Sequence, residues 1–270
     1  MSTARIKRFT PVQKAFHFLL LTTFLIQAAT GLGRMYATTG FGQALNGLFG
    51  GFDASLVVHK WVGMFMLVLF ALHVVYVSIA VLPRVKTGPD SMFPRPRDFG
   101  DLLRHVRWMI GAGKPPSFER WTYWEKFDYW AVFWGMVVLG GTGVLLWNPL
   151  LTSRYLEGWG LNVAFWIHRI EAVLAILHVF IIHFLISHLR VHTFPMDRAM
   201  FAGDTSLEVA HHERADWLQR LRGDNRMEPL LKSEASTSAR AVSMAVGLAA
   251  VLCGLIILVG GLAYAPLLNW

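Results

Sequence analysis

Five long apolar segments dominate the pattern of hydrophobic and polar positions along the chain. They cover residues 16–33, 56–82, 127–147, 163–189 and 241–265, and charged side chains are rare inside them. A bilayer core about 30 Å thick is crossed by roughly 20 apolar residues in an α-helix. The pattern therefore predicts an all-α fold: an integral membrane helical bundle with five spans.

The composition agrees with this prediction. Only 16% of the residues are charged, whereas a soluble domain carries roughly 25%. The net charge of +8 could indicate a nucleic-acid-binding protein. However, the basic residues lie in the gaps between the apolar segments, so we expect no nucleic-acid partner.

The basic residues also predict an orientation in the membrane. Lys and Arg number four before the first segment, none in 36–55, nine in 83–126, one in 148–162 and eight in 190–240. Cytoplasmic loops are the ones enriched in Lys and Arg. The count predicts a cytoplasmic N-terminus, two long cytoplasmic loops and a periplasmic C-terminus.

The content of metal-binding residue types narrows the possible cofactors. The chain has one cysteine, Cys253, and no C-x-x-C-H motif. Covalent c-type haem and iron–sulfur clusters both require more cysteines than this. Any metal chemistry in this chain is therefore expected to use imidazole.

Histidines are concentrated inside the predicted spans, where polar side chains are costly and usually mark function. They are His17, His59, His73, His168, His178 and His183. In the predicted topology His59 and His168 lie at similar depth near the outer face, and His17 and His183 can meet near the inner face. Two such pairs suit two haem groups, each held by two axial histidines.

The spacing of the histidines does not decide which residue is the second inner ligand. His73 follows His59 by fourteen residues, which is about 21 Å along a helix and about 40° around it, so His73 competes with His17. His178 is less well placed than His183. Lys60 and Arg169 directly follow the two outer histidines and are predicted to contact haem propionates, with snorkelling to the interface as the alternative. Glu171 receives no role.

Several motifs resemble a known family, the cytochrome b (gamma) subunits of membrane-bound formate dehydrogenases, and more distantly the hydrogenase-type cytochrome b subunits. In chain order the motifs are RFTPVQKAFH, HKWVG, YWEKFDYW, GGTGVLLWNP and WIHRIEAVLAILHVFIIH. The resemblance covers about residues 5–195. It implies a four-helix di-haem cytochrome b domain over 1–195, followed here by a cytoplasmic loop, 196–240, and an additional C-terminal transmembrane helix, 241–270.

The resemblance also implies a ligand set and partners. It pairs His17 with His183 and His59 with His168 as axial ligands of two haem b groups. It places a quinone site, for menaquinone or ubiquinone, at 123–128, where Tyr123, Glu125, Lys126 and Asp128 are available. It further implies the bacterial inner membrane and an outer iron–sulfur or multihaem cytochrome c partner. His168 and His183 are one residue further apart than in the formate dehydrogenase pattern.

The leading prediction is thus a subunit of a respiratory complex that carries electrons across the membrane between quinone and an extracytoplasmic partner. The chain offers no soluble catalytic domain of its own. A proton- or metal-coupled transporter using the histidines is the alternative. Such a transporter would favour interrupted spans and inverted repeats, and neither is evident.

Overall fold

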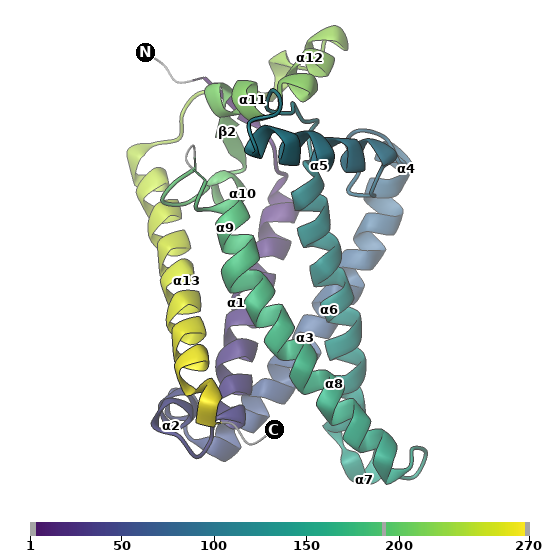
Figure 1. Cartoon of the computed structure of the whole chain (residues 1–270), viewed down its shortest axis with the longest axis vertical. Helices are drawn as coiled ribbons and strands as arrows, with labels where there is room; N and C mark the ends of the chain where they lie inside the picture. Colours follow the sequence, from purple (N-terminus) through teal and green to yellow (C-terminus); the bar gives the residue numbers. More distant parts are fainter. Residues whose placement is uncertain (1–3, 191–192, 268–270) are drawn as a thin grey trace. The chain divides into compact units, whose positions relative to one another are not determined.

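The computed structural model describes residues 4–190 and 193–267, and it contains the five predicted spans (Figure 1). The first is α1 (Pro11–Met35) and the third is α6 (Tyr123–Trp147). The other three are compound: α3 (Phe52–Tyr76) with η1 (Val77–Val81) and α4 (Leu82–Val85); α8 (Gly158–Leu177) with η2 (His178–His183) and α9 (Phe184–Ser187); and α13 (Thr237–Tyr264) with η4 (Ala265–Leu267).

The chain divides into two compact units. The bundle unit comprises 16–72, 132–187 and 246–270. The loop unit comprises 1–15, 73–131 and 188–245. This division cuts across the sequence, because each unit takes segments from all parts of the chain.

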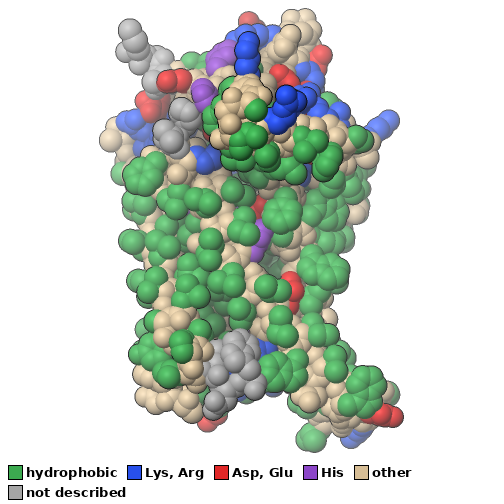
Figure 2. Space-filling model, viewed as in Figure 1, with side chains coloured by type: hydrophobic (Ala, Val, Ile, Leu, Met, Phe, Trp, Pro, Cys, Tyr) green, Lys and Arg blue, Asp and Glu red, His purple; other side chains and the backbone are tan. Residues whose placement is uncertain are grey.

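The bundle unit consists of the greater part of the spans, with α2 (Gly40–Gly47) between α1 and α3 and α7 (Pro149–Thr152) after α6. Hydrophobic side chains cover the visible face of the long helices (Figure 2), as expected for a surface that faces lipid tails. The buried core instead uses α1, η2 and α13, with Ala28, Leu32, Phe180 and Ile257 among its members.

The fifth span is an integral part of this core. A Cβ added at Gly254 would lie 2.7 Å from a ring carbon of Phe180, and one added at Gly260 would lie 2.2 Å from a ring carbon of Phe41. Tyr36 donates a hydrogen bond to the Gly261 carbonyl at 2.7 Å. Small residues let helices approach this closely in a membrane. The fifth helix is therefore tightly packed against the other elements of the bundle unit.

The loop unit contains a small antiparallel sheet that was not predicted from the sequence. Its strand order is β2-β1-β3, with β1 (Arg5–Lys7) between β2 (Asp204–Ser206) and β3 (Leu231–Lys232). Ile6 pairs with Thr205 on one side and Leu231 on the other. Strands this short carry too few residues for an alternating pattern to be visible in the sequence.

Short helices complete the loop unit: α5 (Pro96–Met109), α10 (Ala199–Ala202), α11 (Leu207–Glu213), α12 (Ala215–Gly223) and η3 (Glu228–Leu230). Ile6, Trp217 and Leu218 are at most 2% exposed and form a common core. Much of the segment that we predicted as a loop, 196–240, is therefore folded around the first strand of the chain.

Candidate functional site

Two pairs of histidines face each other inside the bundle unit. His17 of α1 and His183 of η2 have ring centroids 6.5 Å apart. His59 of α3 and His168 of α8 have ring centroids 6.3 Å apart. Each pair joins two different spans, and both are the pairs expected from the sequence.

The spacing of both pairs suits one iron between two imidazoles. With metal–nitrogen bonds of about 2 Å, and each bonded nitrogen about 1.2 Å from its ring centre, the ring centroids are separated by roughly 6.4 Å. This separation therefore leaves room for an iron between the two rings, and no hydrogen bond between the imidazoles has to be assumed. Among the described residues no group of three or more His, Cys, Asp or Glu side chains could hold a metal ion. The separations of the two pairs, 6.5 and 6.3 Å, fit a haem iron held by two histidines.

Threonine hydroxyls set the orientation of the His59 and His168 rings. Thr30 Oγ1 lies 2.9 Å from His59 Nδ1, and Thr142 Oγ1 lies 2.9 Å from His168 Nδ1. Each hydroxyl also donates to a helix carbonyl at 2.7 Å, that of Ile26 or Val138. Because the one hydroxyl proton is used there, each threonine oxygen accepts from Nδ1–H. The Nε2 lone pair then remains for a metal.

Glycines flank the same two rings. A Cβ built at Gly31 would lie 3.5 Å from His59 Cε1, and one at Gly143 would lie 3.5 Å from His168 Cε1. The backbone thus comes close to each ring without a side chain in between. Gly140 differs, because its added Cβ would meet Leu67 at 2.7 Å, which is ordinary close helix packing.

In the His17–His183 pair, a serine hydroxyl lies near one ring. His183 Nδ1 lies 3.5 Å from the Ser187 hydroxyl, at the limit of a hydrogen bond. His183 is also the last residue of the π-helical turn η2. A π turn bonds residue i to i+5 and so takes up one residue more than an α turn. The turn therefore absorbs one of the fifteen residues from His168 to His183.

The alternative ligands occupy other positions. His73 belongs to the loop unit, and its Nε2 lies 3.0 Å from the Tyr129 hydroxyl. His178 begins η2. The His73 and Tyr129 ring centroids are 5.8 Å apart.

The charged residues that follow His59 and His168 contact tryptophans nearby. Lys60 donates to the Trp147 carbonyl at 2.8 Å and lies over the Trp147 ring. The Arg169 guanidinium lies 5.4 Å from the centre of the Trp166 ring. Glu171 lies near α6, with a carboxylate oxygen 3.6 Å from a Cβ built at Gly135. The propionate contacts of Lys60 and Arg169 stay predictions.

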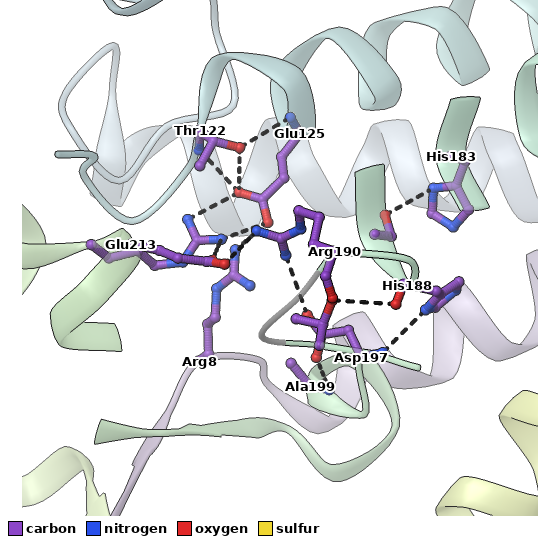
Figure 3. A network of polar contacts seen from close by, with 12 residues as sticks. Arg8, Thr122, Glu125, His183, His188, Arg190, Asp197, Ala199 and Glu213 are labelled. Carbon is purple, nitrogen blue, oxygen red and sulfur yellow. Dashed lines mark hydrogen bonds and ion pairs between the residues drawn. The ribbon is translucent and has the colours of Figure 1, made fainter. Parts of the chain in front are cut away.

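In the loop unit, Glu125 is the centre of an arginine network (Figure 3). Its carboxylate accepts from Arg8 at 2.5 Å and from Arg214 at 2.9 and 3.1 Å. The Thr122 backbone N–H donates to it at 2.9 Å. Arg8 is 4% exposed and Arg214 2% exposed. Burying two guanidinium groups is costly unless they are paired, so Glu125 is a structural residue of this unit.

The other members of the predicted quinone segment are also bonded. Lys126 forms an ion pair with Asp98 at 2.8 Å. Tyr123 has its hydroxyl 2.9 Å from Nδ1 of His105, and burial lowers the pKa of His105 below its usual value. Asp128 is partly buried. His105 was not predicted as a site residue, because it is the single histidine between the second and third spans and so forms no spaced pair.

Thr30, Thr142 and Arg214 were also missed. A threonine inside an apolar span usually bonds to its own helix, so only the tertiary structure identifies the two threonines that also reach a histidine. Arg214 is 89 residues from its partner Glu125.

A family model described as prokaryotic cytochrome b561 matches residues 8–203, which is well over half of the chain. The match includes all four paired histidines. No curated protein matches the chain. The family match supports the electron-transfer prediction over the transporter alternative.

Proposed function

Since the chain belongs to the prokaryotic cytochrome b561 family, it is a membrane protein that binds haem b and transfers electrons, and we propose that it holds two haems in a transmembrane relay. In this proposal His59 and His168 are the axial ligands of one haem, and His17 and His183 those of the other. The observation that carries the proposal is the pair of ring separations, 6.3 and 6.5 Å.

The protein supplies ligands, orientation and a dry path. Each haem iron contributes a one-electron ferric–ferrous couple. Thr30 and Thr142 hold the His59 and His168 rings with Nε2 toward the metal position. The apolar spans exclude water, so that charge on the haem is stabilised only by groups that the chain provides. Fifteen residues between His168 and His183 correspond to about 22 Å along a helix, which gives the relay its length.

The positive-inside asymmetry orients this relay. With the N-terminus inside, the His59–His168 site faces the periplasm and the His17–His183 site the cytoplasm. We infer that a quinone reacts on the cytoplasmic side, near 123–128, with Tyr123 and Asp128 as the groups that exchange protons. His105, which contacts the Tyr123 hydroxyl, extends this route toward water. Lys126 holds the segment in place through Asp98.

The partner is expected outside. A relay that crosses the membrane needs a redox partner that delivers or accepts electrons at the periplasmic face. An iron–sulfur or multihaem cytochrome c subunit is the class of partner that passes single electrons to a haem. A formate dehydrogenase-like complex is the specific assembly that the sequence motifs favour.

Haem content of purified ligand variants tests the proposal. Pyridine haemochrome analysis should give about two haems per chain for the wild type and about one for both His168→Ala and His183→Ala. His178→Ala is the matched control on the same span and should retain two. The remaining haem in each single variant shows that the protein has folded.

Two results would contradict the ligand assignment. A wild-type ratio of about one haem per chain would contradict the two-haem relay. Loss of a haem in His73→Ala, with two haems retained in His17→Ala, would show that the inner ligand is His73 of the second span.

A further inference from the structure

Helix α5 carries an exposed apolar stripe. Phe99, Leu103, Val106 and Ile110 are between 41% and 74% exposed. At 100° per residue Phe99, Leu103 and Val106 lie within about 60° of one another around the helix, and Ile110 directly follows its last residue. An amphipathic helix with a stripe of this kind and a basic polar side is typical of segments that lie in a membrane interface.

The opposite side of α5 is fixed to the rest of the loop unit. Asp98 accepts from Lys126 at 2.8 and 2.9 Å, and His105 contacts the Tyr123 hydroxyl at 2.9 Å. The His105 ring also lies 5.3 Å from that of Trp124. These contacts tie α5 to the first residues of α6. Because these contacts prevent α5 from rotating about its axis, the apolar stripe stays exposed.

A basic hollow of about 700 Å³ adjoins the end of α5. Its cationic lining is Arg97, Arg104, Arg107 and Lys114, and Asp216 is its acidic residue. Arg97 pairs with Asp216, and Arg104 pairs with Asp101. Within 4–190 and 193–267, Arg107 and Lys114 have no ion pair, so two positive charges remain for a ligand.

The chain itself places this hollow at a membrane face. The second span ends at Val85 and the third begins at Tyr123, so α5 and the loop after it connect two spans at one side of the bilayer. The exposed stripe and the two unpaired cations are neighbours in this short connection. Apolar surface and positive charge together match a lipid, whereas a soluble phosphate compound would use the charges alone.

We propose that α5 lies in the bilayer interface and that Arg107 and Lys114 bind the phosphate headgroup of an anionic phospholipid. The stripe from Phe99 to Ile110 contacts the acyl chains, and the hollow receives the headgroup. The bound lipid would hold α5, and with it His105 and Tyr123, at a fixed depth. The site is independent of the haem ligand assignment, because none of its residues belongs to the bundle unit.

Depth is tested with a single reporter. In a Cys253→Ser background, Leu103→Cys is labelled with an environment-sensitive fluorophore, and the haem-loaded protein is placed in vesicles of phosphatidylcholine and phosphatidylglycerol. Brominated phosphatidylglycerol should quench the label strongly. Brominated phosphatidylcholine at the same fraction should quench it less. A label at Asp224→Cys, an exposed position of the same unit, is the matched control and should not be quenched.

Headgroup binding is tested by native mass spectrometry of the purified holoprotein. The double variant Arg107→Gln/Lys114→Gln should bind phosphatidylglycerol roughly 10- to 30-fold more weakly, since each basic residue near an anionic surface contributes about a factor of five. The variant Arg222→Gln/Lys232→Gln removes the same charge from exposed positions and should bind like the wild type.

Three outcomes would overturn the proposal. The double variant retains phosphatidylglycerol like the wild type, the fluorophore on the Leu103→Cys variant is not quenched, or inorganic phosphate at millimolar concentration displaces the lipid from the hollow. The last result would assign the cations to a soluble phosphate ligand.

Discussion

At the scale of single residues, the tautomer of an axial ligand depends on one hydrogen bond. Thr30 and Thr142 each give their only proton to a helix carbonyl and so can only accept from the imidazole. A second-layer acceptor of this kind makes the imidazole a stronger electron donor to the metal. At the other pair, the Ser187 hydroxyl lies farther from the ring, 3.5 Å from His183 Nδ1. The two proposed haems are therefore expected to differ in potential.

Replacement of Thr142 with Val tests this expectation. The change keeps the side-chain shape but removes the acceptor, so the midpoint potential of the His59–His168 haem should rise by roughly 20–60 mV. A spectroscopic redox titration measures it. Thr142→Ser should restore the wild-type potential, because the hydroxyl returns.

Thr23→Val is the control for this experiment. Thr23 lies on the same span as Thr30 and bonds only to the Leu19 and Leu20 carbonyls, so neither haem potential should move. An unchanged potential in Thr142→Val would show that the hydroxyl does not tune the haem.

We expect the two acidic residues of 123–128 to differ in role, with Glu125 stabilising the fold and Asp128 exchanging protons with quinone. Glu125→Gln leaves Arg8 and Arg214 buried beside a neutral group, and we expect a loss of about 3–5 kcal/mol in the stability of the loop unit. Asp128→Asn should preserve the fold and the haem content but slow quinone-dependent electron transfer several-fold. Thermal unfolding and quinone turnover, measured on both variants, distinguish the two classes.

Asp224→Asn, an exposed acid of the same unit, should change neither quantity. If Asp128→Asn turns over quinone like the wild type, the proton-exchange role of Asp128 is wrong.

At the scale of elements, η2 keeps His183 directed toward His17. Fifteen residues of regular α-helix would place His183 about 60° from His168 around the axis. The π turn absorbs one residue, so that the two histidines relate as if they were fourteen apart.

Deletion and insertion in the fourth span test this account. Deleting Ile181 should convert η2 to regular α-helix and leave both haems bound. Inserting one Ala after Leu174 adds a second residue that the π turn has no room to absorb, so the haem at His183 should be lost while the haem at His168 stays. Haem counting checks both variants. Loss of a haem on deletion would show that the π turn itself is needed.

At the scale of the whole molecule, the distribution of charge and the span count together predict the orientation. Lys and Arg are concentrated before the first span, between the second and third spans, and between the fourth and fifth spans. These three segments are therefore expected on the cytoplasmic side. Five spans place the two ends of the chain on opposite sides. A periplasm-only reporter fused after Trp270 should be active, and one placed in 86–95 should be inactive. Activity of a cytoplasm-only reporter after Trp270 would show that the predicted orientation is wrong.

The sequence by itself determined the five spans and the level of each histidine within them. Both follow from fixed quantities: the thickness of the bilayer sets the length of an apolar helix, and the rise per residue sets the depth of a side chain. For this reason the pairing of His59 with His168 was predictable from the residues. The choice of His17 over His73 required the family motifs.

Only the tertiary structure decided which polar side chains contact the histidines and which stabilise the fold. Thr30 reaches His59, and Arg214 reaches Glu125 across 89 residues of chain. Such contacts depend on the rotation and close packing of separate helices, whereas hydropathy records only how apolar each helix is. The small sheet around Ile6 and the packing of α13 also depend on partners distant in the sequence, and a local pattern contains no information about them.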